Sequence, residues 1–409
     1  MKNDGCGANG RGALRVAEAR ARMLDLLRPV DGWECVALRH ALDRILVDDV
    51  IAPFNVPAHD NSAMDGYAVR AADLDASAPT RLKVVGTAFA GKSFSGLVDA
   101  GQAVRIMTGA VMPAGSDAVV IQEIATVDGD YIGVPGGQRS GQNVRRMGED
   151  LAAGKPALRA GTRIGPAELG LAASLGIAEV RVRRRLRVAF FSTGDELASI
   201  GHTLGAGEVY DSNRYTLFGA LTRLGVEVID MGVVRDDPEL IETAFTTASA
   251  TADVVITTGG VSVGEADYVK ALVARLGEVR FWKMEIKPGR PMAFGRIGSA
   301  WFFGLPGNPV AVMVSFYQLA LDPLLTLMGV DPLPVRPTLT ARCTDGLKKA
   351  TARREFPRGI LFEQDGEWWV RPVGKQGSGV LSSMADANCF IVLPEDTGNV
   401  AAGDAVAVQ

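Results

Sequence analysis

The stretch Thr257-Thr-Gly-Gly-Val-Ser-Val-Gly-Glu-Ala-Asp267 decides the fold of this chain, and it follows the apolar segment 253–256. Glycines directly after a buried strand allow a tight turn and leave backbone N–H groups free to face an anion. A helix beginning near Asp267 would add the positive end of its dipole. Because Glu265 and Asp267 are acidic, a divalent cation would have to bridge protein and phosphate. A plain turn is an equally good interpretation of the stretch alone.

The two common nucleotide-binding fingerprints are absent from this loop. A Walker A loop requires Gly-Lys followed by Ser or Thr, and no lysine lies in the stretch. The glycines at 259, 260 and 264 do not match Gly-x-Gly-x-x-Gly either. A generic nucleotide phosphatase or a dehydrogenase is therefore a weak interpretation.

Composition indicates a folded protein of several domains. The 409 residues suffice for two to four domains, and 47% hydrophobic with 22% charged residues is ordinary for a soluble chain. Lys and Arg number 43 against 47 acidic residues, which gives a net charge of −4. This balance argues against a nucleic-acid partner held by bulk charge.

Cysteine usage and hydropathy predict a cytoplasmic protein with no membrane partner. The cysteines at 6, 35, 343 and 389 form no Cys-x-x-Cys pair, and only three histidines occur. The N-terminus has no secretory character. The apolar segment 310–321 is too short to span a membrane and contains Ser315 and Gln318, so we expect a buried helix.

Residues 185–330 alternate between strand and helix patterns, which predicts a parallel, doubly wound sheet with ligands at the strand C-termini. The expected strands are Leu186–Phe191, Val226–Met231, Val254–Thr257 and Trp301–Gly304. The expected helices are Tyr215–Leu224, Pro238–Ala250, Tyr268–Leu276 and Val310–Leu327.

The sequences before and after this central region have residue patterns that differ from it. An amphipathic helix is expected over 13–27, and short β-branched runs between 80 and 147 indicate a small β-rich domain. After Pro332 the chain becomes β-rich again, with a hairpin turn at Asp365-Gly366. We therefore predict a multidomain α/β protein whose central domain is flanked by β-containing domains, the last of them barrel-like. The predicted boundaries are 1–55 with 148–184, 56–147, 185–330 and 331–409.

Four carboxylates are expected at one edge of the central sheet: Glu196, Asp236, Glu265 and Asp267. So many like charges repel one another unless a cation or a basic ligand group lies among them. Simple helix capping is the alternative for neighbouring residues: Asp237 before Pro238, and Ser212 or Asn213 before the helix that follows them.

Cations and a rigid loop come later in the same domain. Lys283, Lys287 and Arg290 fall within eight positions and could bind oxyanions, although a solvated basic turn has the same composition. The loop Gly304–Pro309 then leads into the last helix of the domain, with Pro309 suited to its first turn. The arginine cluster 353–358, taken alone, favours a surface turn.

Taken together, these segments resemble the MoeA family, the molybdopterin molybdenumtransferases, to which the E domain of gephyrin is related. The similarity extends over nearly the whole chain from about residue 13, and so many ordered motifs are far more specific than any one of them. They are Asp60-Asn-Ser-Ala-Met-Asp-Gly-Tyr-Ala, Arg105-Ile-Met-Thr-Gly-Ala, Arg146-Met-Gly-Glu-Asp150, Ser192-Thr-Gly-Asp-Glu196, Thr258-Gly-Gly-Val-Ser-Val-Gly, Lys287-Pro-Gly-Arg-Pro and Gly304-Leu-Pro-Gly-Asn-Pro-Val.

The resemblance implies a Mg²⁺-dependent reaction in which molybdate and adenylylated molybdopterin give molybdenum cofactor and AMP. It also implies an elongated homodimer whose active site combines segments of both subunits. The implied catalytic acids are Asp65, Asp150, Glu196, Asp236 and Asp267, of which Glu196, Asp236 and Asp267 are candidate Mg²⁺ ligands. The implied substrate-binding residues are Thr108, Gly259, Gly260, Ser262, Lys283, Lys287, Pro306 and Pro309, with Arg358 and Ser378 for molybdate.

Two other functions compete with this one. A gephyrin-like scaffold would need no active site, yet the ionic positions are all present, which a retired site need not keep. A molybdopterin adenylyltransferase would resemble the central domain but lacks the long flanks. Such an adenylyltransferase, and proteins that handle the finished cofactor, are instead candidate partners.

Overall fold

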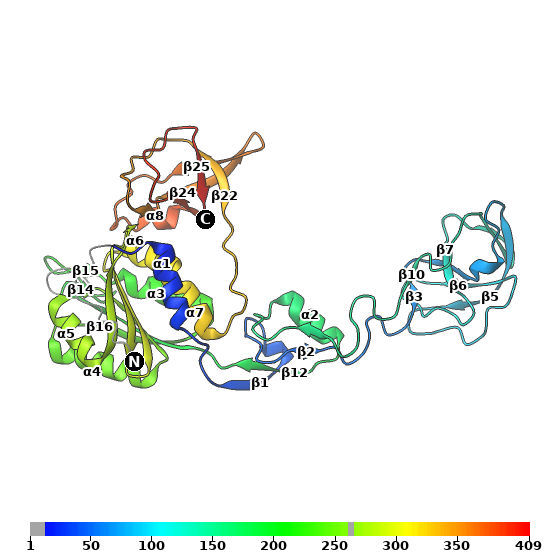
Figure 1. Ribbon diagram of the computed structural model, residues 1–409, viewed down its shortest axis with the longest axis horizontal. Helices are drawn as coiled ribbons and strands as arrows, with labels where there is room; N and C mark the ends of the chain where they lie inside the picture. The colour runs from blue at the N-terminus through cyan, green and yellow to red at the C-terminus, as the bar shows by residue number, and fades with distance from the viewer. Residues whose placement is uncertain (1–12, 261–265) are drawn as a thin grey trace, which may run out of the picture.

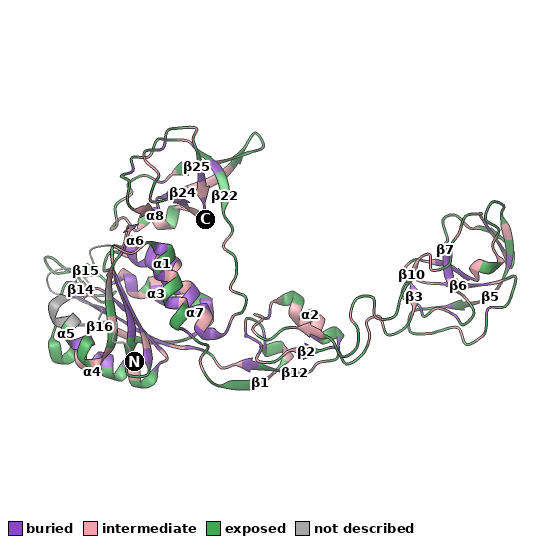
Figure 2. Ribbon diagram, in the orientation of Figure 1, coloured by how far each residue is buried: buried purple, intermediate pink, exposed green. Residues whose placement is uncertain are grey.

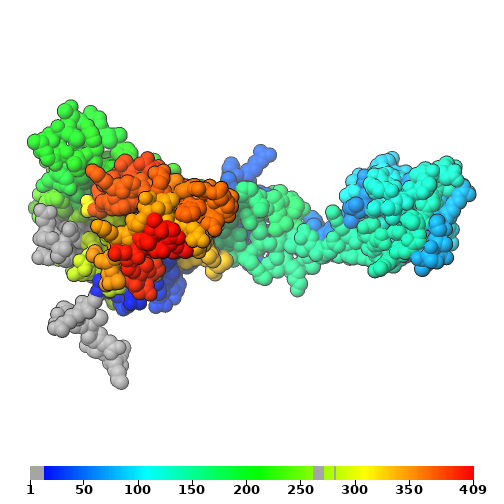
Figure 3. Space-filling model, turned by 90° about the horizontal axis from the view of Figure 1, so that it is seen from above, coloured from blue at the N-terminus to red at the C-terminus, as the bar shows by residue number. Residues whose placement is uncertain are grey.

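The chain leaves an α/β domain, runs out to a distant β domain and returns, ending in a C-terminal barrel (Figure 1). The computed structural model describes residues 13–260 and 266–409. Seen from above in Figure 3, the β domain lies at one end of an elongated molecule, away from the α/β domain and the barrel. Helix α1 (Val16–Leu26) packs against the α/β domain before the chain departs.

The α/β domain is built on a six-stranded sheet with the order β16-β13-β17-β21-β20-β18. Its strands are β13 (Arg187–Thr193), β16 (Glu227–Val234), β17 (Val254–Thr258), β18 (Gly277–Lys283), β20 (Pro291–Ile297) and β21 (Ala300–Leu305). The four predicted strands are present, and β16, β13, β17 and β21 are parallel to one another. Their carboxyl ends therefore meet at one edge, as expected for a ligand site.

The prediction of an all-parallel sheet was wrong at one side. Strand β20 pairs antiparallel with β21, and β18 pairs antiparallel with β20 in a register from Gly277 opposite Ile297 to Lys283 opposite Pro291. Glycines at 277 and 295 permit this close pairing, because a Cβ at either would lie about 2 Å from a carbonyl oxygen of the facing strand. The basic stretch that begins at Lys283 is therefore the connection between the edge strand β18 and its neighbour β20.

Helices cover both faces of the sheet, and its central strands β13, β17 and β21 are almost entirely buried (Figure 2). The helices are α3 (Ser212–Leu224), α4 (Pro238–Thr251), α5 (Ala266–Leu276), α6 (Pro309–Ser315) and α7 (Leu321–Met328), the last two joined by a π-helical segment η3 (Phe316–Ala320). Successive residues of β13 alternate between the two cores: Val188 and Phe190 pack with α1, α3 and α7, whereas Ala189 and Phe191 pack with α4. This period of two is what a sheet covered on both faces requires.

Helix caps explain two of the polar residues noted in the sequence. Asp237 caps α4 by accepting hydrogen bonds from the amides of Glu239 and Leu240, as predicted. The cap of α3 was predicted at Ser212 or Asn213, but Asp211 is the residue that accepts from the amide of Arg214. Helix α3 begins at Ser212 itself, which leaves the preceding residue to cap it.

The apolar helix at the end of the domain belongs to the core. Residues Pro309–Met328 are long and apolar enough to cross a membrane, with a mean hydropathy of 1.6, but 78% of this segment is buried inside the protein. Val310, Val314, Leu319 and Leu324 are fully buried against the sheet. The prediction of a buried helix is therefore confirmed.

A middle region and a β domain extend from this body. The middle region contains β1 (Trp33–Ala37) paired with β12 (Glu179–Arg183), β2 (Val50–Ile51) paired with β11 (Pro156–Leu158), the short η1 (Leu38–His40) and α2 (Pro166–Ser174). The distant β domain has a six-stranded sheet of β4 (Gly66–Val69), β5 (Thr80–Ala88), β6 (Gln102–Ile106), β7 (Ala118–Ile121), β8 (Thr126–Asp128) and β9 (Tyr131–Val134), with η2 (Ala71–Asp73) and the pair β3 (Asn61–Ser62) and β10 (Val144–Arg145).

The C-terminal domain is a closed five-stranded barrel, in agreement with the barrel-like prediction. Asp365 and Gly366 both have positive φ values, 52° and 78°, and form the predicted two-residue hairpin turn. The barrel consists of β22 (Leu339–Cys343), β24 (Arg358–Gln364), β25 (Glu367–Pro372), β26 (Cys389–Val392) and β27 (Ala405–Val408), with α8 (Ser382–Asp386). Two short pairs link elements elsewhere: β14 (Leu197–Ala198) with β15 (Val209–Tyr210), and β19 (Ile286–Lys287) with β23 (Arg354–Glu355).

The carboxylate of Asp253 holds together the starts of strands β13 and β17. Asp253 accepts two hydrogen bonds from the guanidinium of Arg184, at 2.7 and 2.8 Å, and one from the amide of Arg187 at 2.9 Å. Burial by itself would raise the pKa of Asp253, but the bonds from Arg184 and Arg187 outweigh it and lower that pKa to about 2.

We expect Asp253→Asn to destabilise the α/β domain by about 1–2 kcal/mol at pH 7, after allowance for solvent screening. The folded pKa lies below the unfolded value, so the stabilisation is present above the unfolded pKa and is lost as the pH falls toward about 2. Hydrogen exchange of the β13 and β17 amides measures the effect. Asp128→Asn, in the exposed pair with Arg81, is the control. Equal protection of Asp253→Asn and the unmodified protein at pH 7 would contradict the expectation.

Candidate functional site

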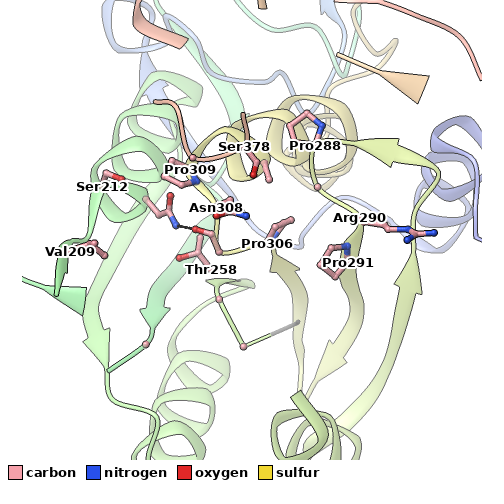
Figure 4. Close-up of a pocket in the computed structure, with 18 of the residues that line it drawn as sticks. Val209, Ser212, Thr258, Pro288, Arg290, Pro291, Pro306, Asn308, Pro309 and Ser378 are labelled. Atoms are coloured by element: carbon pink, nitrogen blue, oxygen red, sulfur yellow. Dashed lines mark hydrogen bonds between the residues drawn. The ribbon is translucent and has the colours of Figure 1, made fainter. Parts of the chain in front are cut away.

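A cavity of about 980 Å³ lies between the carboxyl ends of the central strands and the C-terminal domain. Figure 4 shows Val209 and Ser212 on one side of it, and Arg290 and Pro291 on the other. Ser378 enters from the C-terminal domain, above Pro309 at the start of α6. The cavity is therefore bounded by two domains of the same chain.

The described glycines of the glycine-rich loop, Gly259 and Gly260, lie in the wall of this cavity. Gly259 has φ +87°, and a Cβ there would lie 2.5 Å from the carbonyl oxygen of Thr193, so only glycine fits. Gly307 lies beside it, because a Cβ on Gly307 would be in ordinary contact, at 3.7 Å, with the Cα of Gly259. Gly259 and Gly260 both line the cavity, whereas the predicted Ser262 lies outside the described residues. The loops after β17 and β21 thus meet without intervening side chains.

Two of the predicted carboxylates line the cavity. Glu196 follows β13, and its carboxylate folds back over Gly194, where a Cβ would lie 2.6 Å from Oε2. Asp236 follows β16, and its amide donates to the carboxylate of Asp195 at 3.2 Å. Asp267 belongs to the first turn of α5, but its side chain is not described.

The carboxylates of the cavity could bind Mg²⁺ only together with substrate phosphates and water. Among the described residues, no group of three or more His, Cys, Asp or Glu side chains could hold a metal ion. Mg²⁺ does not need such a cage, since it commonly binds through one or two carboxylates together with substrate phosphates and water. Glu196 and Asp236 could supply those carboxylates.

Cations line the cavity after β18, at the other side of the sheet from the carboxylates that follow β13 and β16. Lys287, Arg290 and Arg353 all contribute to the wall. The ammonium of Lys287 lies 3.0 Å from the carboxylate of Glu355, whose side chain is only 6% exposed. Lys283, predicted as a ligand, is an exposed residue at the end of β18 and is not among the lining residues. The cationic wall is thus formed by the β19–β20 connection and by the residue before β23.

Arg358 has a different environment from the one predicted. It is 1% exposed, and its guanidinium donates hydrogen bonds to the Ser383 hydroxyl and to the backbone carbonyls of Lys375, Gln376 and Gly377. Burial lowers the pKa of this arginine. These contacts hold the segment 375–377, so Arg358 shapes the loop that carries Ser378 rather than lining the cavity itself.

The same loop is docked onto the last helix of the α/β domain. The amide of Val310 donates to the carbonyl of Ser378 at 3.0 Å. Pro306 and Pro309, both predicted, line the cavity beneath it. The side chain of Gln376 further braces the loop by donating to the carbonyls of Arg358 and Val373. Ser378 is therefore held where two domains meet.

Three predicted residues lie away from this cavity within the single chain. Asp65 and Thr108 belong to the distant β domain, where the amide and hydroxyl of Thr108 both donate to Asp65 at 2.7 Å. The hydrogen bond from the Thr108 amide, and after it the smaller effect of the hydrogen bond from the Thr108 hydroxyl, lower the pKa of the Asp65 carboxyl. Asp150 adjoins the bridge between Val56 and Leu151, where the chain returns to the middle region.

Several lining residues were not assigned to the site from sequence. Arg290 was considered as an anion ligand without being selected, and Arg353 was placed in a surface turn. Asn213 was interpreted only as a capping candidate, although it and Asp211 are both buried in the cavity wall. The parallel pairing of β19 with β23, which brings Arg353 to Lys287, is a contact between domains that sequence spacing does not reveal.

Comparisons with known proteins give the family. The model of the MoeA N-terminal region (domain I and II) matches residues 14–176, that of a probable molybdopterin binding domain matches 189–326, and that of the MoeA C-terminal region (domain IV) matches 340–409. This chain belongs to the MoeA family.

Relatives within the MoeA family match it almost end to end. A protein of Haemophilus influenzae named molybdopterin molybdenumtransferase is 46% identical over 97% of this chain and 98% of its own length. Molybdopterin molybdenumtransferase 2 of Mycobacterium tuberculosis is 38% identical over 94% and 95%. The crystal structure of the molybdopterin biosynthesis moeA protein from Pyrococcus horikoshii superposes with a TM-score of 0.83 at 29% identity, covering 97% of this chain and 99% of that one.

We expect Arg358→Lys to loosen the loop 375–378, because an ammonium cannot reproduce bonds from one planar group to several carbonyls. The local opening free energy should fall by about 2 kcal/mol. Hydrogen exchange over 375–379 measures this change. Arg342→Lys, at an exposed arginine of the same barrel paired with Glu367, should leave the loop unchanged. Unaltered exchange in Arg358→Lys would show that the arginine does not hold the loop.

Proposed function

We propose that this chain inserts molybdate into adenylylated molybdopterin with release of AMP, as a transferase of molybdenum cofactor biosynthesis. The observation that carries the proposal is the division of charge in the cavity, with Glu196 and Asp236 after β13 and β16 at one side of the sheet and Lys287, Arg290 and Arg353 grouped after β18 at the other. The names of its close relatives as molybdopterin molybdenumtransferases support the same activity.

Molybdate would bind at the cationic side. It is a hard oxyanion, so Lys, Arg and hydroxyl donors suit it better than soft ligands. Lys287, Arg290 and Arg353 offer the charge, and Ser378 offers a hydroxyl on the loop above them. In this proposal Arg358, originally predicted as a direct ligand, acts by holding that loop, and Arg353 takes its place at the anion.

The phosphates of the substrate would lie toward the glycine loop and the carboxylates. Mg²⁺ bound there would neutralise phosphate charge and favour departure of AMP. Glu196 and Asp236 would hold it, while the predicted contribution of Asp267 stays a prediction. Gly259 and Gly260 would let the substrate approach the backbone closely. The substrate brings its own dithiolene sulfurs, so no cysteine ligands are needed.

A homodimer would bring the remaining predicted residues to the site. Asp65 and Thr108 lie far from the cavity of their own chain, at the other end of an elongated molecule (Figures 1 and 3). The β domain of a second copy could supply them, together with Asp150 from the adjoining segment. We also propose a cytoplasmic location, and delivery and acceptance of ligands by an adenylyltransferase and by cofactor-handling proteins.

The non-catalytic scaffold is the second candidate. It requires no particular charge distribution in a cavity, whereas this chain keeps both carboxylates and cations in the lining of one cavity. No observation on the described residues favours the scaffold over the transferase.

Purified protein should release AMP from adenylylated molybdopterin in a molybdate-dependent manner. Arg353→Ala should raise the molybdate concentration for half-maximal rate by about 10-fold or more, since a charge-assisted hydrogen bond contributes about 1.5–3 kcal/mol. The exposed Arg342→Ala is the matched control and should behave like the unmodified protein. AMP release that does not depend on molybdate would refute the transferase assignment. An unchanged response of Arg353→Ala to molybdate concentration would show that Arg353 is not part of the anion site.

Chelation of divalent cations should abolish AMP release, and added Mg²⁺ should restore it. Glu196→Gln should raise the Mg²⁺ concentration required by an amount on the order of 10-fold, because the ion loses a carboxylate oxygen. Glu208→Gln serves as the control, since the carboxylate of this exposed glutamate accepts from the amide of Gly205. Full activity in the presence of chelator would falsify the magnesium proposal.

A further inference from the structure

Three buried oxygen atoms in the wall of the cavity have no hydrogen-bond partner in the part of the chain that the structure describes. They are Thr193 Oγ1, Asp211 Oδ2 and Asn213 Oδ1. Their residues are 8%, 3% and 6% exposed, and all three line the cavity. Buried polar groups are nearly always paired, so three at one place require an explanation.

The neighbouring contacts determine which atoms are left over. The amide nitrogen of Asn213 donates to the carbonyl of Gly307 at 2.6 Å. Because a carbonyl can only accept, the orientation of this side-chain amide is set and its oxygen is the unpaired atom. Asp211 uses Oδ1 to cap α3, accepting from the amide of Arg214 at 3.1 Å, which leaves Oδ2. Both leftover atoms are pure acceptors.

The three residues surround the place where the two glycine loops meet. A Cβ on Gly259 would lie 3.0 Å from Thr193 Oγ1, and a Cβ on Gly307 would lie 3.7 Å from the Cα of Gly259. Gly307 in turn carries the carbonyl that Asn213 binds. Thr193 and Asn213 therefore flank this junction, and Asp211 is two residues from Asn213 at the N-terminus of α3.

We propose that Thr193, Asp211 and Asn213 form a recognition subsite for a cluster of N–H or O–H donors on the substrate, an inference that rests on the proposed function. A phosphate or molybdate group is the wrong partner, since it offers acceptors and would face the charge of Asp211. Two parts of the proposed substrate carry adjacent donors: the amino-pyrimidinone edge of the pterin, and the ribose hydroxyls of the adenylate. Either would satisfy the unpaired oxygens and orient the substrate with its anionic groups toward the cations.

The test is isothermal titration calorimetry with two separate probes, AMP and a tetrahydropterin. Asp211→Asn keeps the helix cap, because asparagine caps as well as aspartate. Its amide group then faces the substrate donors with donors of its own, and at least one probe should bind about 10-fold more weakly or worse. Asp237→Asn, the same change at the exposed cap of α4, should leave both affinities unchanged.

The probe whose affinity falls identifies the part of the substrate that the subsite binds. A loss for AMP indicates the ribose, and a loss for the tetrahydropterin indicates the pterin. Affinities for both probes within twofold of the unmodified protein would overturn the subsite, as would an unmodified protein that binds neither. Thr193→Val, which removes the hydroxyl at nearly constant shape, carries the test if Asp211→Asn does not fold. Molybdate-dependent AMP release by the unmodified protein distinguishes failure of this subsite from failure of the proposed function.

Discussion

The cavity depends on one short strand pairing between two domains. Ile286 and Lys287 of β19 pair in parallel with Arg354 and Glu355 of β23, and the amide of Phe356 donates to the carbonyl of Lys287 at 3.0 Å. The buried Glu355 adds an ion pair to Lys287 at the same place. This contact joins the barrel to the edge of the central sheet. Together with the hydrogen bond from the Val310 amide to the Ser378 carbonyl, it holds the barrel loop over the strand ends.

The pairing has an electrostatic consequence. It brings Arg353, the residue just before β23, to the wall that already contains Lys287 and Arg290. The carboxylates Glu196 and Asp236 come from the strand ends of the α/β domain on the other side. A substrate carrying phosphate and pterin in one molecule therefore meets charges of both signs in a single cavity, which restricts its orientation.

The central fold could be predicted because its strands are apolar on both faces and its helices are amphipathic. Two glycines after β17 and the Pro-Gly-Asn-Pro loop before α6 marked the edge that binds ligands, and both line the cavity. Strand β18 was missed because its charged and aromatic residues, such as Arg280 and Trp282, are unlike those of a buried parallel strand. Strand β20 was missed because it begins at Pro291 and contains Gly295, which are unusual inside a strand. Their antiparallel pairing follows from contacts across the sheet edge.

The roles of individual site residues were harder to predict where they depend on whether the side chain is buried. Arg353 and Arg358 are five residues apart in one basic cluster, and nothing local tells the lining arginine from the one that holds a loop. The difference arises from β23 and β24, whose pairing partners lie in other parts of the chain. Asp65 and Thr108 raise a related difficulty, since their proposed role requires a second copy of the chain.

Diffraction from crystals grown with molybdate tests the central claim most directly, because molybdenum can be located by its anomalous scattering. The account predicts one strong anomalous peak in the cavity between the two domains, within contact distance of Lys287, Arg290, Arg353 and Ser378. A molybdate bound only elsewhere on the protein, or no bound molybdate in crystals saturated with it, would contradict the account.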